Sequence, residues 1–379
     1  MQLGVSDVHL HPGTPPGFRM KGDMINVKMP PLTDEDMIRI CGYMVKDQEV
    51  LQNLPKLKDY DGSFEVKGLS RFRFNIFRNR GKIGAILRLI PAIIPTIDQL
   101  KLPGVLRTIA DMHRGLVLVT GATGSGKSST LAAMIDHINT NHKMHILTIE
   151  DPVEFVHQQK MSRVTQREVG TDTNSFAGAL RSALRQDPDV ILVGEMRDAE
   201  TIDIALKAAE TGHMVFSTVH TTDAIKTIGR LISVFPPEEQ RMVRMRLADN
   251  LTATVSQRLI ARAEGTGMVA AQEIMIANGG IRECISDPAL TGQINDFISK
   301  SRELVGGQTF EQHLVELYQA GHISLVAAKE AASNAADFER NLIYGSGKKS
   351  ADRGAPNPDD DIQLDHLADS EAASEDDAA

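Results

Sequence analysis

The 379 residues of this chain, 41% hydrophobic and 24% charged, suffice for roughly two to three globular domains and do not have the composition of a wholly disordered protein. The formal net charge of −9 is concentrated at one end, because residues 346–379 hold ten acidic and three basic residues and leave 40 acidic against 38 basic residues elsewhere. This near-neutral remainder gives no support to broad nucleic-acid binding, and two cysteines, Cys41 and Cys284, are too few for a disulfide framework or a four-cysteine zinc site.

The sequence also indicates where the protein works. No apolar run approaches the roughly 18 to 20 residues that a membrane-spanning helix needs, and the first residues lack the pattern of a secretory signal. We therefore expect a reduced, cytosolic protein. Residues 346–379, rich in Ala, Asp, Ser and Pro, are predicted to form a disordered acidic tail, which either aids solubility or serves as a docking or regulatory segment.

The first hundred residues alternate short apolar runs with turn residues, which is typical of a small α+β domain over 1–100. Thr33 is followed by three acidic residues, and this pattern predicts the start of a helix. Prolines from Pro91 to Pro103 lead into a predicted linker over 101–114. The predicted strands lie at 7–11, 18–20, 25–27, 64–66, 70–77 and 84–90.

From residue 115 the pattern changes to that of an α/β protein. Short apolar runs alternate with helical segments, and such alternation predicts a parallel sheet in a core over 115–280. The predicted strands of this core lie at 116–120, 145–149, 190–193 and 214–219. Residues 281–345 are predicted to be a cluster of helices, with 308–319 and 325–334 the clearest.

The strongest motif follows the first strand of this core. Residues 121–128, GATGSGKS, match G-x-x-x-x-G-K-[ST], in which glycines turn backbone N–H groups toward phosphate oxygens at the start of a helix. In such a loop Lys127 would reach the β- and γ-phosphates, and the Ser128 hydroxyl would ligate Mg²⁺. The predicted nucleoside triphosphate site consists of Gly121, Ala122, Thr123, Gly124, Ser125, Gly126, Lys127, Ser128 and Ser129.

Two further strands of the core end in acidic residues. The segment 189–195, DVILVGE, ends in Glu195, which we expect to act as the general base and to help hold Mg²⁺. An acidic loop over 150–154 follows another strand, at the sheet edge where α/β proteins bind ligands, although a solvated loop is the alternative. His213 and His220 bracket the strand 214–219, and their spacing is not a metal-ligand signature, so from the pattern alone they would be structural.

Five arginines crowd an 18-residue stretch of the first domain: Arg71, Arg73, Arg78, Arg80 and Arg88. One interpretation is a solvated basic face. The other is that some of them reach a nucleotide held by a neighbouring subunit, since an arginine supplied in trans can raise the rate of phosphoryl transfer by about 10³- to 10⁵-fold.

At this point four ordered motifs resemble those of the ATPases of type II/IV secretion and of type IV pili, and most of all the pilus retraction (twitching motility) ATPases. Beside the phosphate-binding loop, the similar segments are 148–155 (TIEDPVEF, the aspartate box), 184–198 (LRQDPDVILVGEMRD), 209–213 with 217–221 (AETGH and STVHT, the histidine box) and 5–10 (VSDVHL, the N-terminal opening). The resemblance covers about residues 4–340.

The resemblance implies a ring-shaped homohexamer in which a PAS-like N-terminal domain is joined flexibly to a RecA-like C-terminal domain, with ATP and Mg²⁺ bound between them. It implies a motor at the cytoplasmic face of the inner membrane that acts on a platform protein of the pilus machine and binds no nucleic acid. The residues that it implies are Glu154 and Glu195 for metal and water, His213 and His220 for linking the γ-phosphate to domain movement, and Arg73, Arg80 and Arg88 for sensing the nucleotide.

Details of the resemblance separate retraction from assembly. Extension ATPases usually carry an extra N-terminal domain and a four-cysteine zinc element, so two cysteines and an opening at the PAS-like domain favour retraction. In the A-I-R-N-L-I-R-E element of retraction ATPases, Ser286 replaces the second arginine, which keeps an accessory retraction ATPase open as a second reading. An assembly ATPase for pilus extension or type II secretion, a RecA-like nucleic-acid motor and a non-hydrolysing scaffold also remain open.

Overall fold

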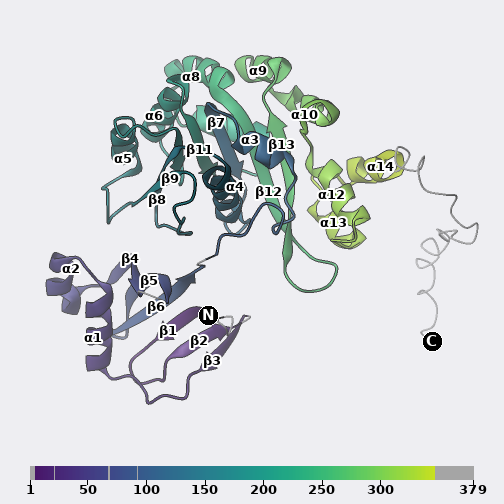
Figure 1. Ribbon diagram of the computed structural model, residues 1–379. Helices are drawn as coiled ribbons and strands as arrows, with labels where there is room; N and C mark the ends of the chain where they lie inside the picture. The colour runs from purple at the N-terminus through teal and green to yellow at the C-terminus, as the bar shows by residue number, and fades with distance from the viewer. Residues whose placement is uncertain (1–4, 21, 67–68, 92, 346–379) are drawn as a thin grey trace, which may run out of the picture.

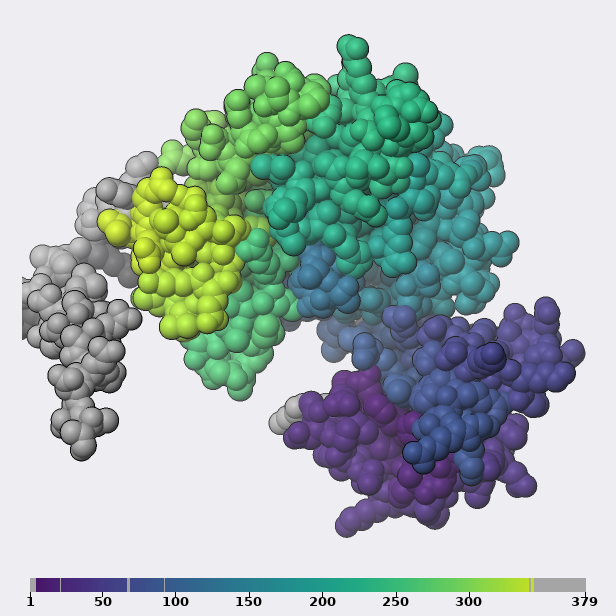
Figure 2. Space-filling view, turned by 180° about the vertical axis from the view of Figure 1, so that it is seen from behind, coloured from purple at the N-terminus to yellow at the C-terminus, as the bar shows by residue number. Residues whose placement is uncertain are grey.

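The computed structural model describes residues 5–20, 22–66, 69–91 and 93–345, so the predicted acidic tail over 346–379 lies outside the described residues. Two β-sheets organise the chain (Figure 1). With their helices they form two lobes, here called the N-terminal lobe (5–90) and the C-terminal lobe (97–345), and the N-terminal lobe is the purple and blue one in Figure 2. In the part of the chain that is described, no helix has the length and apolar character to cross a membrane.

The N-terminal lobe is built on a six-stranded antiparallel sheet with the strand order β3-β2-β1-β6-β5-β4. Helix α1 (Asp34–Met44) begins as predicted, because the Thr33 hydroxyl accepts a hydrogen bond from the Asp36 N–H at 3.1 Å and the Asp36 side chain bonds back to the Thr33 N–H. The other elements are β1 (Val5–Leu10), β2 (Gly17–Met20), β3 (Asp23–Asn26), α2 (Gln48–Asn53), η1 (Leu54–Lys56), β4 (Asp59–Val66), β5 (Ser70–Asn79) and β6 (Lys82–Ile90). All six predicted strands are confirmed.

The two faces of this sheet differ in character. Along β5, Phe72, Phe74 and Ile76 are buried in the core of the lobe, which α1 covers. Arg71 and Arg73 alternate with them and therefore belong to the opposite face, since successive side chains of a strand point to opposite sides. One face thus builds the core, and the other presents arginines.

The C-terminal lobe contains a seven-stranded sheet with the order β13-β12-β7-β11-β10-β8-β9, in which every neighbouring pair is parallel except β12 and β13. Its strands are β7 (Gly115–Thr120), β8 (His145–Glu150), β9 (Arg163–Glu168), β10 (Val190–Val193), β11 (Met214–Val219), β12 (Leu251–Ala261) and β13 (Met268–Ile276). The predicted parallel sheet and its four predicted strands are confirmed. The sequence interpretation did not name β9, β12 or β13.

Helices cover both faces of this sheet (Figure 1). Leu116 and Leu118 of β7 pack on one side and Val117 and Val119 on the other, which explains why the strand is apolar throughout. On the side of Val117 and Val119 lie α3 (Val105–Ala110) and α4 (Lys127–Asn141). The helices on the side of Leu116 and Leu118 are α5 (Phe176–Ala183), α6 (Ala199–Glu210), α7 (Ala224–Ser233), α8 (Pro237–Asn250), α9 (Gly279–Ser286) and α10 (Ile294–Lys300).

The last part of the chain is helical, as predicted for 281–345. Beyond α10 it contains α11 (Arg302–Val305), α12 (Phe310–Gln319), α13 (Leu325–Ala331) and α14 (Ala335–Gly345), and η2 (Thr291–Gln293) precedes α10. Phe310 and Leu314 of α12 pack with Ile260 and Val269 of β12 and β13. This cluster extends the sheet edge that lies away from the N-terminal lobe (Figure 1).

The segment 101–114 differs from its predicted role as a linker. It contains α3, whose Leu106 and Ile109 are completely buried against the sheet. The helix begins at Gly104 without a side-chain cap, so the sequence offers no start signal of the kind seen at Thr33. This part of the segment is therefore packed into the C-terminal lobe.

Candidate active site

The glycine-rich loop connects the end of β7 to the start of α4. Gly121 and Gly126 have φ angles of 146° and 86°, which L-residues with side chains rarely adopt. A Cβ on Gly121 would lie 2.5 Å from the backbone oxygen of Gln257, so no side chain fits there. Since no side chain caps the first turn of α4, its N–H groups remain open to an anion.

Lys127 begins α4 as a buried cation. Its Nζ donates hydrogen bonds to the backbone oxygens of Gly121 and Ala122, both at 3.0 Å. Burial lowers the pKa of Lys127, and the charges of Glu195 and Glu154 oppose that shift. The ammonium group therefore lies within the field of two carboxylates, where phosphate oxygens could replace the two carbonyl groups as its partners.

A cavity of about 510 Å³, a volume typical of small-molecule sites, adjoins the loop and is lined by both lobes. Six of the nine predicted loop residues line it, namely Thr123, Gly124, Gly126, Lys127, Ser128 and Ser129. Its acidic lining residues are Glu150, Asp151, Glu154 and Glu195, and its other basic ones are Arg73, Arg88, Arg197, His157 and His220. Gly121, Ala122 and Ser125 belong to the loop but do not line the cavity.

Glu195 lies just beyond β10 and holds a small charge network. Its Oε1 is 2.6 Å from Arg197 Nε and 3.3 Å from His220 Nε2. Burial raises the pKa of Glu195, but the hydrogen bond and charge of Arg197, together with His220, outweigh it and bring the pKa below its usual value. The side chain is therefore an ionised carboxylate at neutral pH.

The acidic loop after β8 contains two different kinds of carboxylate. Glu150 is held in place, because its Oε1 accepts hydrogen bonds from Thr148 Oγ1 at 2.7 Å and from Gln166 Nε2 at 3.1 Å. Burial raises the pKa of Glu150 despite these bonds. Glu154 is exposed and lines the cavity. Glu154, like Asp151, which is also exposed and lines the cavity, is thus free to meet a ligand.

The two arginines of the N-terminal lobe that line the cavity come from one row across the N-terminal sheet. Asp7 of β1 is opposite Arg88 of β6, Arg88 is opposite Arg73 of β5, and Arg73 is opposite Ser63 of β4. Arg88 Nε is 2.8 Å from Asp7 Oδ1, whereas no hydrogen bond or ion pair holds Arg73 among the described residues. Like charges directly opposite one another destabilise a sheet, so an anion between these guanidinium groups would be favourable.

Arg80 and His213 are not brought to the cavity. Arg80 occupies the turn between β5 and β6 with a φ of 52°, and it lies seven positions beyond Arg73, about 23 Å along the strand. His213 precedes β11, so the length of this strand, about 20 Å, lies between it and His220. Within one protomer, Arg80 and His213 therefore do not face the nucleotide site at which the resemblance implied roles for them.

The structure offers a source for two of these arginines within a single chain. Arg73 and Arg88 line the cavity beside the phosphate-binding loop of their own chain. A neighbouring subunit is therefore not needed to bring them to it.

A residue that the sequence interpretation missed, Glu168, connects the two lobes. At the end of β9 its carboxylate is 2.6 Å from Ser63 Oγ and 2.9 Å from Arg71 Nη2, both in the N-terminal sheet. The same carboxylate accepts a hydrogen bond at 3.1 Å from the N–H of Val153, which belongs to the acidic loop. Its two partners in the N-terminal lobe are about a hundred residues away in the chain, so no local pattern could have indicated the link.

Comparison with known proteins places these features in context. The model of the family described as type II/IV secretion system protein matches residues 98–331. The type IV pilus retraction ATPase PilT of Pseudomonas aeruginosa is 47% identical over 335 residues, 88% of this chain and 96% of the relative. The type IV pilus ATPase PilU of the same organism is 38% identical over 347 residues, 91% of this chain and 90% of the relative.

A crystal structure of the pilus retraction motor PilT with bound ADP has a similar fold. Its TM-score is 0.81 at 46% sequence identity, and the match covers 89% of this chain and 96% of that one.

Proposed function

Because this chain belongs to the type II/IV secretion system protein family, we propose that it is an ATP-hydrolysing motor that retracts type IV pili and so drives twitching motility. The similarity to PilT extends over nearly the whole of that relative. The observation that carries the proposal is the cavity in which Lys127 and Glu195 of the C-terminal lobe meet Arg73 of the N-terminal lobe. ATP bound there would contact both lobes at once.

The residues around the cavity fit Mg²⁺ and a triphosphate. The hydroxyl of Ser128 and the carboxylates of Glu154 and Glu195 are hard oxygen donors, the kind that Mg²⁺ prefers. These three residues would hold the ion, which would neutralise charge on the β- and γ-phosphates. The loop N–H groups and Lys127 would hold the phosphates, and Arg73 and Arg88 would approach them from the other lobe.

Hydrolysis would then require a general base, and its coupling to movement would require a residue that responds to the γ-phosphate. Glu195, ionised and at the end of β10, would take the proton from the attacking water. His220, 3.3 Å from Glu195, would register whether the γ-phosphate is present. A ligand shifts a conformational equilibrium only by its differential affinity for the two states, so Arg73 and Arg88 must contact ATP better when the lobes are closed.

The proposal includes the architecture that the sequence suggested. The N-terminal lobe is the PAS-like domain of about 1–100, and the C-terminal lobe is the RecA-like core of 115–280 with its helices over 281–345. Six chains would form a cytoplasmic ring against the inner-membrane pilus machine, and lobe movement would displace its platform protein.

The competing functions differ in how well the similarities support them. PilU is less similar to this chain than PilT is, at 38% against 47% identity, which favours the principal retraction motor over an accessory one. An assembly ATPase, a nucleic-acid motor and a non-hydrolysing scaffold each lack a specific supporting observation.

Deleting the gene in its host and imaging the pili tests the proposed function. Cells without the motor should carry surplus long pili that no longer shorten, and the wild-type gene should restore shortening. Bald cells would instead indicate an assembly ATPase, and pili that shorten at the normal rate would contradict a principal role in retraction.

The link through Glu168 leads to a prediction about lobe coupling. Changing Glu168 to Gln removes the charge that Arg71 pairs with but keeps an oxygen that can accept from the Val153 N–H. Hydrogen bonds to charged groups contribute about 1.5 to 3 kcal/mol, so the two lobes should separate more readily. We expect faster hydrogen exchange in the acidic loop and turnover reduced several-fold, because Arg73 lies two residues from Arg71 on the same face of β5.

Glu65→Gln provides the matched control for this experiment. Glu65 is opposite Arg71 on β4 but is exposed, so its loss should change neither hydrogen exchange nor turnover. Unchanged exchange in the acidic loop of the Glu168→Gln protein would mean that Glu168 does not couple the lobes.

A further inference from the structure

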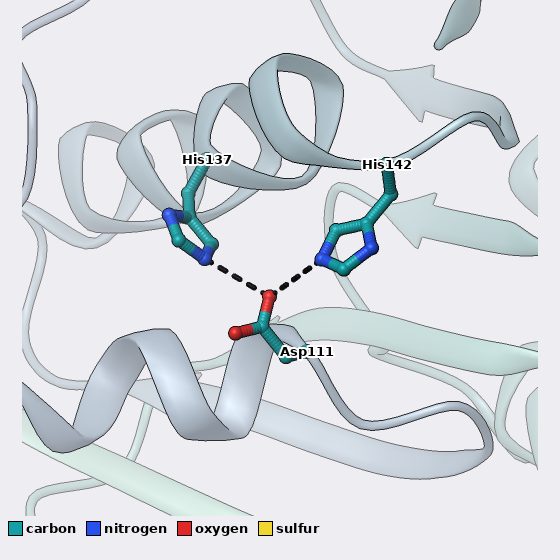
Figure 3. Close-up of side chains that lie close together, drawn as sticks. All are labelled: Asp111, His137 and His142. Atoms are coloured by element: carbon teal, nitrogen blue, oxygen red, sulfur yellow. Dashed lines mark hydrogen bonds and ion pairs between the residues drawn. The ribbon is translucent and has the colours of Figure 1, made fainter. Parts of the chain in front are cut away.

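A cluster of metal-binding side chains lies outside the nucleotide cavity. Asp111 follows α3, His137 lies in the second half of α4, and His142 follows the end of α4 (Figure 3). Asp111 Oδ1 is 2.9 Å from His137 Nε2 and 2.8 Å from His142 Nε2. One donor atom from each residue lies within 4.8 Å of the others. Both rings thus point to a single carboxylate oxygen.

Sequence spacing alone would not have suggested this cluster. Two residues five apart in a helix are about 140° apart around its axis and do not share a face. His142, however, has left the helix, with φ −124° and ψ 151°, and its ring turns back toward Asp111. The two histidines therefore reach the same carboxylate because the helix ends before His142, which the spacing in the sequence does not show.

We propose that Asp111, His137 and His142 form a site for a divalent transition-metal ion, Zn²⁺ by preference, that joins α3 to the end of α4. Two imidazoles and a carboxylate suit Zn²⁺, with water as the fourth ligand. Zn–N and Zn–O bonds of about 2.0 to 2.2 Å in a tetrahedron separate the donor atoms by about 3.3 to 3.5 Å. The present N···O distances would therefore have to open by about 0.5 Å, which small side-chain rotations can provide.

The surroundings of the cluster are compatible with metal exchange. The side chains of Asp111, His137 and His142 are 42%, 19% and 30% exposed, so an ion and a water molecule can enter from solvent. In the metal-free cluster the Nε2 atoms of both rings are hydrogen-bonded to Asp111 Oδ1, and a bound ion would take the place of these two hydrogen bonds.

Asn141 supplies a second contact to His137. Its Nδ2 lies 3.2 Å from His137 Nδ1 and donates to the His137 backbone oxygen at 2.8 Å. Once the ion occupies Nε2, the ring proton must move to Nδ1, and an acceptor at position 141 would then hold the ring in place. Asn141→Asp should therefore tighten metal binding by about 10- to 100-fold, the range known for such outer contacts.

The ion would act on structure rather than on the phosphates. His142 lies fourteen positions beyond Ser128 in the chain, a distance of about 21 Å along the helix. Bound metal would fasten the far end of the helix that begins at Lys127 to α3, the element that leads into the C-terminal lobe. Because the ion binds the folded chain, it should raise the melting temperature.

The test titrates the full-length, chelator-treated protein with Zn²⁺ against a chromophoric chelator and repeats the titration with Co²⁺. We expect one tight site per chain, a tetrahedral Co²⁺ spectrum and a melting temperature that rises with Zn²⁺. Asp111→Asn and His142→Gln should weaken binding at least about 10-fold and remove the thermal shift, whereas Mg²⁺-dependent turnover should persist. His113→Gln, an exposed histidine two residues from Asp111, is the matched control and should bind like the wild type.

The result that overturns the proposal is equally plain. If the wild type binds no Zn²⁺ at micromolar concentration, or if Asp111→Asn and His142→Gln bind it as tightly as the His113→Gln control, the three residues form a hydrogen-bonded cluster only.

Discussion

Replacing Glu195 by Gln is expected to lower ATP turnover by about 10²- to 10⁴-fold while ATP binding stays nearly intact. The carboxylate is ionised because Arg197 and His220 outweigh its burial, and the amide that replaces it cannot take a proton from water. A loss of this size corresponds to about 3 to 5 kcal/mol of barrier. Phosphate release in the steady state and equilibrium binding of a fluorescent ATP analogue measure the two effects separately.

Two variants frame this experiment. Lys127→Ala should lose nucleotide binding itself, because it removes the buried cation of the phosphate-binding loop. Glu200→Gln makes the same chemical change five residues away, on α6 and outside the cavity, and should behave like the wild type. Near-normal turnover by Glu195→Gln would remove Glu195 from the role of general base.

The chemistry of the C-terminal lobe could be predicted because it is local in the sequence. The glycines, Lys127 and Ser128 of the phosphate-binding loop follow one another directly, and an apolar strand delivers Glu195 to the same edge of the sheet. Parallel strands place their carboxyl ends together, so the phosphate-binding loop, the acidic loop after β8 and Glu195 had to lie at one edge once the strands were identified.

Which arginines of the N-terminal lobe reach the cavity depends on how β5 pairs with β6. The number of arginines in this stretch of sequence does not reveal that pairing. A signal was nevertheless present. The two-residue turn at 80–81, with φ angles of 52° and 78°, fixes the pairing of β5 with β6 and hence puts Arg73 opposite Arg88. The same turn carries Arg80 to the far end of the hairpin. Glu168 had no such signal, since only the packing of the lobes brings it to Arg71.

Replacing Arg73 by Ala should lower turnover by about 10³-fold, the lower end of the effect of arginines that stabilise phosphoryl transfer. Arg73 faces the cavity without an ion-pair partner among the described residues, so its charge is available to the triphosphate, whereas Arg88 is engaged with Asp7. Arg73→Lys should recover only part of the loss, because lysine lacks the planar fork of donors. Arg80→Ala is the control and should leave turnover unchanged. Full activity of Arg73→Ala would show that Arg73 does not act on the phosphates.

Mixing variants decides which chain the arginine serves. Arg73 lines the cavity of its own chain. In hexamers mixed from Arg73→Ala and Lys127→Ala subunits, each chain therefore lacks one of the two residues, so no site is complete and turnover should stay low. If Arg73 instead reached a neighbour's nucleotide, some interfaces of the mixed ring would combine an intact Lys127 with an intact Arg73, and activity would reappear. The closing movement would then lie between subunits, so the lobes of a single chain could not be the unit that ATP draws together.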